Sequence, residues 1–123
     1  MPLCFIVEDH GDTREGYAEF LEASGFAVRT ASAAEQFRQL IKQNVPDVIL
    51  MDLRLPRTDG WQLTREIRHD PRVRHVPVIV VSASVLEEDR ALAQEAGCDA
   101  FLPKPCDLDV ILDTIRRLTS AHQ

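Results

Sequence analysis

Several side chains with chemical capability stand directly after short apolar runs of the chain. Glu8 and Asp9 follow the first run, Asp52 follows the third, Ser82 follows the fourth, and the fifth leads into Lys104. Mg²⁺ is usually held by one or two carboxylates together with water and phosphate oxygens. A hydroxyl and an amine hold phosphoryl oxygens, one by a hydrogen bond and the other by charge. The set therefore suits phosphoryl chemistry beside a magnesium ion.

Asp52 is the hardest of these residues to explain structurally. It follows four apolar residues, 48–51, on a strand that should be central, so its carboxylate should be close to buried. A buried, unpaired carboxylate is costly, and three acids in one place repel one another without a cation. A carboxylate is also a nucleophile toward phosphorus. We therefore expect Asp52 to accept a phosphoryl group.

The other four have ordinary explanations when each is taken singly. The acidic pair Glu8 and Asp9 suits the start of a loop or of a helix. Ser82 suits a helix cap. Lys104 suits a solvent-facing loop, although the prolines on both sides of it restrict its backbone. Only their combination with Asp52 points to a site.

Alternating apolar runs and helical stripes predict the elements that position these residues. The runs, rich in Val, Ile and Phe, cover residues 3–7, 26–30, 48–51, 78–81 and 100–102. The first, third and fourth are apolar at nearly every position, as in strands that are buried on both faces of a parallel sheet. The clearest of the five intervening helical stripes consists of Leu108, Ile111, Leu112, Ile115 and Leu118. Five strands alternating with five helices predict a parallel α/β sheet with right-handed crossovers, which binds ligands outside the carboxyl ends of its strands.

Length and composition predict one globular domain spanning residues 1–123. The chain is 45% hydrophobic and 28% charged, which is an ordinary globular composition. Its net charge is −6, so it lacks the basic charge that binds nucleic acid and would be repelled by anionic membranes. No apolar stretch approaches the roughly 20 residues of a membrane span. The three cysteines are odd in number and form no Cys-x-x-Cys pattern, which favours a reducing cytoplasm over a disulfide framework or a zinc site.

The order and spacing of five motifs give the chain a specific resemblance. It resembles the CheY-like receiver domains of response regulators in two-component signalling. The resemblance covers nearly the whole chain, and its motifs are FIVED at 5–9, DVILMDLRLP at 47–56, TDGW at 58–61, VVSA at 80–83 and GCDAFLPKP at 97–105. Each motif alone is weak evidence for the resemblance, whereas the five motifs together are strong evidence for it.

The resemblance implies a phosphoacceptor site. Asp52 would be the phosphoacceptor. Glu8 and Asp9 would hold Mg²⁺, directly or through water, together with the carboxylate of Asp52 and the backbone carbonyl of Arg54. Lys104 would pair with Asp52 or with its phosphoryl oxygens.

The resemblance also implies a switch and a fold. Ser82 would be the switch hydroxyl, Phe101 the coupled switch aromatic, and the Lys104–Pro105 bond would be cis. The fold would be a doubly wound (βα)5 three-layer sandwich with flavodoxin-like strand order 2-1-3-4-5, two helices on one face and three on the other.

The implied function is that of a phosphorelay receiver. A histidine kinase or a phosphotransfer protein would supply the phosphoryl group, so the chain would catalyse only its own phosphorylation and dephosphorylation. The face formed by the fourth helix, fifth strand and fifth helix would then change shape and bind a downstream protein, or act on an effector domain that this chain does not contain. Candidate residues on that face are Val85, Leu86, Phe101 and Pro103.

Three other functions fit less well. A haloacid-dehalogenase-type phosphatase carries a second Asp two positions after its nucleophile, where this chain has Arg54. A flavodoxin needs a phosphate-binding loop after the first strand, where residues 8–10 are instead Glu-Asp-His. A phosphorylation-independent interaction module of receiver fold is the remaining alternative.

Arg54 has two interpretations. Its side chain either reaches over the mouth of the site and affects water access, or it is a solvated surface residue.

Overall fold

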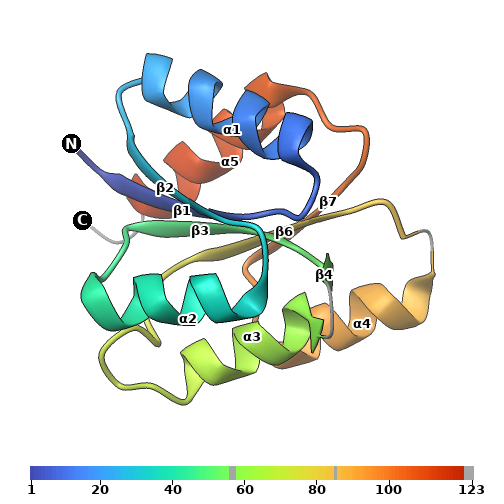
Figure 1. Cartoon of the computed structure of the whole chain (residues 1–123). Coiled ribbons are helices and arrows are strands. Elements are labelled where there is room, and N and C mark those ends of the chain that lie inside the picture. Colours follow the sequence, from blue (N-terminus) through green and yellow to red (C-terminus); the bar gives the residue numbers. More distant parts are fainter. Residues whose placement is uncertain (56–57, 85, 121–123) are drawn as a thin grey trace.

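Five parallel strands form the central sheet of the computed structural model, which describes residues 1–55, 58–84 and 86–120. They are β1 (Leu3–Val7), β2 (Ala27–Ala31), β3 (Val48–Asp52), β6 (Val78–Ser82) and β7 (Ala100–Pro103). Their order in the sheet is β2-β1-β3-β6-β7 (Figure 1), which is 2-1-3-4-5 when these five strands alone are counted. The predicted fold class and strand order are therefore confirmed.

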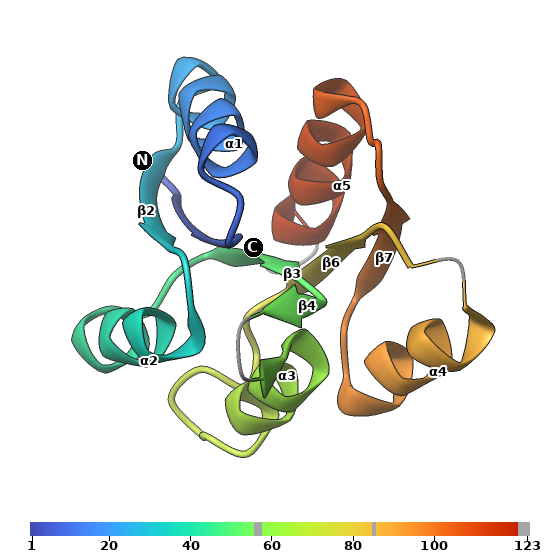
Figure 2. The same cartoon turned by 45° about the vertical axis from the view of Figure 1, so that its right-hand side comes forward.

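Five helices cover the two faces of this sheet in the arrangement expected from the sequence. Figure 2 shows α1 and α5 on one face and α2, α3 and α4 on the other. Their bounds are α1 (Gly11–Ala23), α2 (Ala34–Gln43), α3 (Gly60–Arg68), α4 (Glu87–Ala96) and α5 (Leu108–Ser120). Helix α4 ends at Gly97, whose φ of 108° lies in the left-handed region that glycine adopts without a Cβ penalty.

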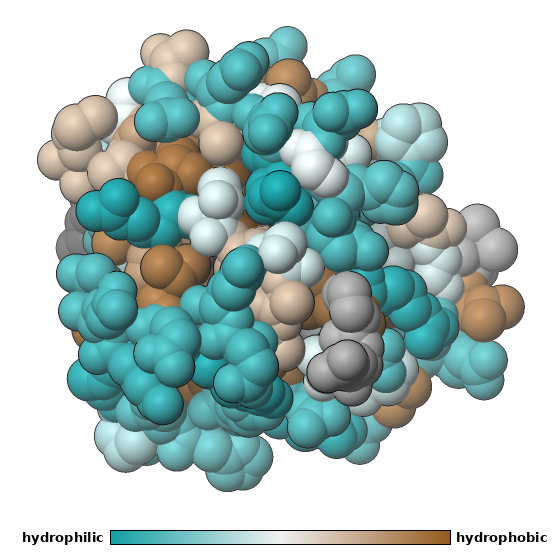
Figure 3. Space-filling model, in the orientation of Figure 1, coloured by the Kyte–Doolittle hydropathy of each residue, from teal (hydrophilic) through white to brown (hydrophobic). Residues whose placement is uncertain are grey.

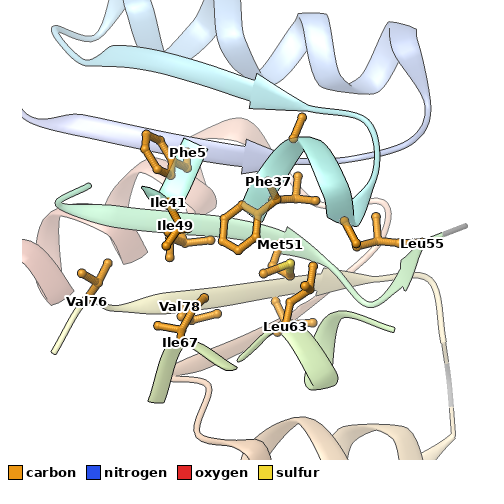
Figure 4. Packing of buried hydrophobic residues seen from close by; sticks show 14 of the residues in the cluster. Phe5, Phe37, Ile41, Ile49, Met51, Leu55, Leu63, Ile67, Val76 and Val78 are labelled. Atoms are coloured by element: carbon orange, nitrogen blue, oxygen red, sulfur yellow. The ribbon is translucent and has the colours of Figure 1, made fainter. Parts of the chain in front are cut away.

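The core consists of two apolar layers, one on each side of the sheet. All five residues of β3 and all five of β6 are buried, as the continuous apolar runs predict. Because successive side chains of a strand point to opposite faces, Phe5 of β1 packs toward α2 and Ile6 toward α1 and α5. Figure 4 shows the first layer, in which Phe37 of α2 and Leu63 of α3 lie over the sheet.

A small ribbon after β3 was not predicted. Strands β4 (Arg54–Leu55) and β5 (Thr58–Asp59) pair in antiparallel fashion, with Arg54 opposite Asp59. Two-residue strands leave no periodicity in a sequence, so apolar patterning does not detect them. The ribbon places Arg54 directly behind the end of β3 and leads at once into α3.

One face of the molecule shows how polar and apolar side chains are distributed on the surface. The face in Figure 3 is largely hydrophilic, with small separate hydrophobic patches. Within the described ranges no helix has both the length and the apolar character needed to cross a membrane. At the amino-terminal edge of the sheet, Pro2 near one end of the chain and Thr119 near the other line the same hollow.

Candidate functional site

The carboxyl ends of four strands gather the polar residues predicted from the sequence. Glu8 directly follows β1, Asp52 and Ser82 are the last residues of β3 and β6, and Lys104 directly follows β7. Asp52 is 9% exposed, as its place after an apolar strand predicts, and Glu8 and Ser82 are buried too, at 1% exposure each. The backbone N–H of Lys104 donates to the carbonyl of Ser82 (2.8 Å), which ties the lysine to the edge of the sheet.

Lys104 brings a positive charge to the two buried acids, and its main partner is Glu8. Its Nζ donates to Glu8 Oε1 and lies 3.5 Å from Asp52 Oδ2. The sequence pointed to Asp52 or its phosphoryl group as the partner. The buried carboxylate of Glu8 takes the lysine because it needs a cation of its own. The Lys104–Pro105 peptide bond is cis.

The two buried carboxyls do not ionise alike. Burial, followed by the hydrogen bond and the charge of Glu8, raises the pKa of Asp52 to about 7. Burial also works against ionisation of Glu8, but hydrogen bonds from Asp52 and Lys104 leave its pKa below its ordinary value. Burial works against the charged form of Lys104, but the hydrogen bond that it donates to Glu8 and the charges of Asp52 and Glu8 leave its pKa above the ordinary value. The pair therefore keeps one proton near neutral pH.

These residues fit a divalent cation. Ligand atoms of Glu8, Asp9 and His10 lie within 4.8 Å of one another, and Asp52 adjoins Glu8 on the other side. Within the described residues, the Lys104 ammonium pairs with Glu8 and Asp52, and the raised pKa of Asp52 indicates that this one lysine does not balance both carboxylates. Carboxylate oxygens are the ligands that Mg²⁺ prefers. Sequence reasoning assigned His10 to the loop and did not include it in this group.

A cleft of about 380 Å³ opens above Asp52. Its wall includes two residues that sequence reasoning missed, Ser84 and Asp89, because an acid in the first turn of a helix is ordinary and carries no signal of a site. The complete lining is Asp9, His10, Asp52, Arg54, Ser82, Ala83, Ser84, Leu86, Asp89 and Lys104.

Arg54 is one of the residues that line this cleft. Its guanidinium donates to Asp89 Oδ2 at 2.7 Å, lies 3.6 Å from Asp59 Oδ1, and has its Cζ 5.7 Å from the centre of the Trp61 ring. Its backbone N–H donates to Asp52 Oδ1 at 3.3 Å. The Arg54 side chain is thus held by partners on β5, α3 and α4, and an effect of this side chain on water access to the site stays a prediction.

The residues assigned to the switch come from two neighbouring strands, Ser82 from β6 and Phe101 from β7. Ser82 Oγ accepts the backbone N–H of Ser84 at 3.1 Å. Phe101 on β7 is half-buried, with the Arg90 guanidinium 5.8 Å from its ring centre. Of the residues expected on the output face, Leu86 is 51% exposed, whereas Val85 lies outside the described residues.

Comparison with known proteins assigns the family. The family model described as the response regulator receiver domain matches residues 4–116. The chain belongs to this family. It is 35% identical over 112 residues to the polar-differentiation response regulator DivK of Brucella ovis, and the match covers 90% of each chain. The predicted membership in two-component response regulators is thus confirmed.

Solved receiver domains have the same fold as this chain. The signal receiver domain of a signal transduction histidine kinase from Syntrophus aciditrophicus matches with a TM-score of 0.92 at 28% identity, over 98% of this receiver domain and 92% of that chain. The receiver domain of the sensor histidine kinase PA1611 of Pseudomonas aeruginosa matches with a TM-score of 0.89 at 30% identity, over 97% of this chain and 98% of that chain. That structure has a magnesium ion coordinated in its active site cleft.

Proposed function

We propose that this receiver domain accepts a phosphoryl group on Asp52 from the phosphohistidine of a histidine kinase or a phosphotransfer protein. The observation that carries the proposal is the buried carboxyl of Asp52 at the end of a central strand, on the floor of an open cleft and 3.5 Å from the Lys104 ammonium. A structural acid in this position would need a full ion pair, whereas Lys104 is engaged by Glu8. The arrangement leaves Asp52 free to react.

The reaction is a direct transfer between two side chains. An oxygen of the ionised Asp52 carboxylate attacks phosphorus, a P–O bond forms, and the P–N bond to the donor imidazole breaks. The imidazole keeps the electron pair of that bond and takes up a proton from water. Lys104 stabilises the charge on the phosphoryl oxygens, so the site contributes positioning and electrostatics rather than acid–base chemistry.

Mg²⁺ would be held at this site by Glu8, Asp9, the carboxylate of Asp52 and the backbone carbonyl of Arg54. When bound, it supplies positive charge to the phosphoryl oxygens. The Mg²⁺ in the cleft of the Pseudomonas aeruginosa receiver domain supports this assignment.

Phosphorylation would also switch a protein-binding surface, beginning with the contacts of Ser82. Ser82 Oγ accepts the N–H of Ser84, so its own proton is available to donate to a phosphoryl oxygen. Movement of Ser82 would shift the loop toward α4 and leave space for Phe101. Phosphorylation then biases an equilibrium between existing states of the face formed by α4, β7 and α5. The ligand of that face is a downstream protein or an effector domain.

The test is the intact mass of the protein after incubation with Mg²⁺ and acetyl phosphate. We expect one added phosphoryl group that is absent with EDTA, absent in Asp52→Asn, and lost at alkaline pH as an acyl phosphate would be. Asp113→Asn is a matched control, because it removes an exposed acid of α5. If neither acetyl phosphate nor beryllofluoride modifies the protein, the phosphorylation-independent interaction module becomes the better description.

A further inference from the structure

A chain of polar contacts links the phosphoacceptor to the first turn of α4. The Arg54 guanidinium donates to Asp89 Oδ2 (2.7 Å), and the hydroxyl of Ser84 donates to the same oxygen (2.5 Å). The N–H of Ser84 in turn donates to Ser82 Oγ. Arg54 comes from the ribbon behind β3 and Asp89 from α4, so their ion pair joins the two walls of the cleft.

Apolar packing holds α4 only weakly. The buried residues of this helix are Asp89, Ala93 and Ala96, and neither alanine has a large side chain to insert into the core. Burial of a large aliphatic side chain contributes about 1.5–3 kcal/mol, and a methyl group much less. Polar anchoring through Asp89, whose side chain is 6% exposed, therefore carries more of the attachment of α4 than it does for a helix with bulky core residues.

Arg54 is placed to exchange one anion for another. Its side chain is 57% exposed and lines the same cleft as Asp52, and its N–H already contacts the Asp52 carboxylate. A phosphoryl group on Asp52 would bring additional negative charge and three acceptor oxygens to that cleft. The planar guanidinium binds phosphoryl oxygens in a bidentate manner, as it does carboxylates.

We propose that Arg54 pairs with Asp89 when Asp52 is unmodified and turns to the phosphoryl oxygens when Asp52 is modified. This inference rests on the proposed function and adds to it a route from the site to α4. Once Arg54 leaves, the nearly buried carboxylate of Asp89 retains Ser84 but loses its cation. A buried charge without its partner is unfavourable, so the first turn of α4 opens toward water.

Binding of beryllofluoride with Mg²⁺, measured by titration calorimetry, tests this exchange. In the wild type, binding must break the Arg54–Asp89 pair, so Asp89→Asn should tighten binding by about 3- to 10-fold, given the energies of partly exposed ion pairs. Glu88→Gln removes the same charge from an exposed position in the same helical turn and should leave the affinity unchanged. In an Arg54→Ala background, Asp89→Asn should have no effect.

Two further measurements report the movement itself. Trp61 is the sole tryptophan, and the Arg54 guanidinium lies against its ring, so beryllofluoride should shift the emission of the wild type but not that of Arg54→Ala. Amide hydrogen exchange in residues 87–96 should rise on binding, and should already be raised in Arg54→Ala without ligand.

The outcomes separate the two proposals. If the wild type binds no beryllofluoride, the proposed function is overturned, and so is the proposed exchange of Arg54 between Asp89 and the phosphoryl oxygens. A wild type that binds with the same affinity as Asp89→Asn, with unchanged hydrogen exchange in α4, overturns the exchange alone and leaves phosphorylation of Asp52 standing.

Discussion

Glu8 and Asp52 share one ammonium group, and this imbalance sets the properties of the site at the scale of single residues. Burial, together with the hydrogen bond and the charge of Glu8, raises the pKa of Asp52 to about 7, and the Lys104 ammonium, which hydrogen-bonds Glu8 and lies 3.5 Å from Asp52, offsets this only in part. A second lysine would remove one negative charge from the site and would weaken its affinity for a divalent cation. The excess of acidic groups therefore lowers the stability of the metal-free fold and favours binding of a divalent cation.

Replacing Asp52 with Asn should stabilise the metal-free protein. The pKa of Asp52 is raised on folding, from 3.8 to about 7, so its contribution to stability is complete below pH 3.8 and is lost as the pH rises through about 7. In EDTA, the melting temperature of the wild type should fall between pH 5 and pH 8 more than that of Asp52→Asn. At pH 8, the free energy of unfolding of Asp52→Asn should exceed that of the wild type by roughly 1–3 kcal/mol, since a shift of one pKa unit corresponds to about 1.4 kcal/mol. Parallel pH profiles for the two proteins would contradict this assignment of the raised pKa.

Binding of Mg²⁺ should show the opposite dependence on pH. A cation and a proton compete for the Asp52 carboxylate, so the affinity for Mg²⁺ should increase from pH 5.5 to pH 8 and level off above the pKa of about 7. Titration calorimetry in buffers of different ionisation enthalpy should detect proton release near neutral pH. An affinity that does not change over this range would show that the metal does not contact Asp52.

At the scale of elements, the start of α3 is fitted to the end of β3. The N–H of Gly60 donates to the carbonyl of Leu53 at 2.6 Å, and a Cβ at position 60 would meet the backbone carbonyl oxygen of Asp52 closer than real Cβ atoms come. The helix can begin immediately behind Asp52 because Gly60 has no side chain.

Gly60→Ala should therefore damage both stability and the site. We expect a loss of about 1–3 kcal/mol in the free energy of unfolding and a slower formation of the phosphoryl adduct, since Asp52 must shift. Gly16→Ala is the matched control, because nothing lies within 4 Å of a Cβ at that position of α1, and it should stabilise by about 0.5–1 kcal/mol. Urea denaturation of both variants measures the contrast, and equal effects would contradict the close fit at Gly60.

The elements differ in how far the sequence predicts them. Buried parallel strands are continuous apolar runs, so β3 and β6 were located to within one residue, and the polar residues at their ends were found with them. The β4–β5 ribbon was missed because it has no apolar period. The Arg54–Asp89 pair was also missed, because it depends on how the ribbon and α4 approach each other in space. Patterning predicts which residues reach the sheet edge, not which side chains pair across it.

At the scale of the whole molecule, the two ends of the strands carry different features. The carboxyl edge carries the acidic cleft, and the opposite edge is tied together by Arg68 of α3. Its guanidinium donates to the carbonyls of Gly97, Arg74 and Val76 and to Asp99 Oδ2, and Asp99 also accepts the N–H of Val78. One side chain thus joins α3 to the segments that enter β6 and β7.

Arg68→Met should destabilise the fold without altering the reactivity of the folded protein. It leaves several carbonyl groups without their donor, and we expect a loss of about 2–4 kcal/mol in the free energy of unfolding by urea. Arg65→Met, an exposed arginine of the same helix, should change it little. The rate of adduct formation at Asp52 should stay at the wild-type value at 15 °C. A marked change in that rate would show that the two edges are coupled.

The hollow that Pro2 and Thr119 share lies at the edge of the sheet away from the cleft, and this placement decides how the molecule can be attached to something else. A surface tether or a fluorescent reporter added near either position would leave the cleft open to a kinase. Two reporters, one at each position, would start close together and would respond poorly to events at the cleft. A sensor for the modified state is better built with one label at this edge and the other on α4.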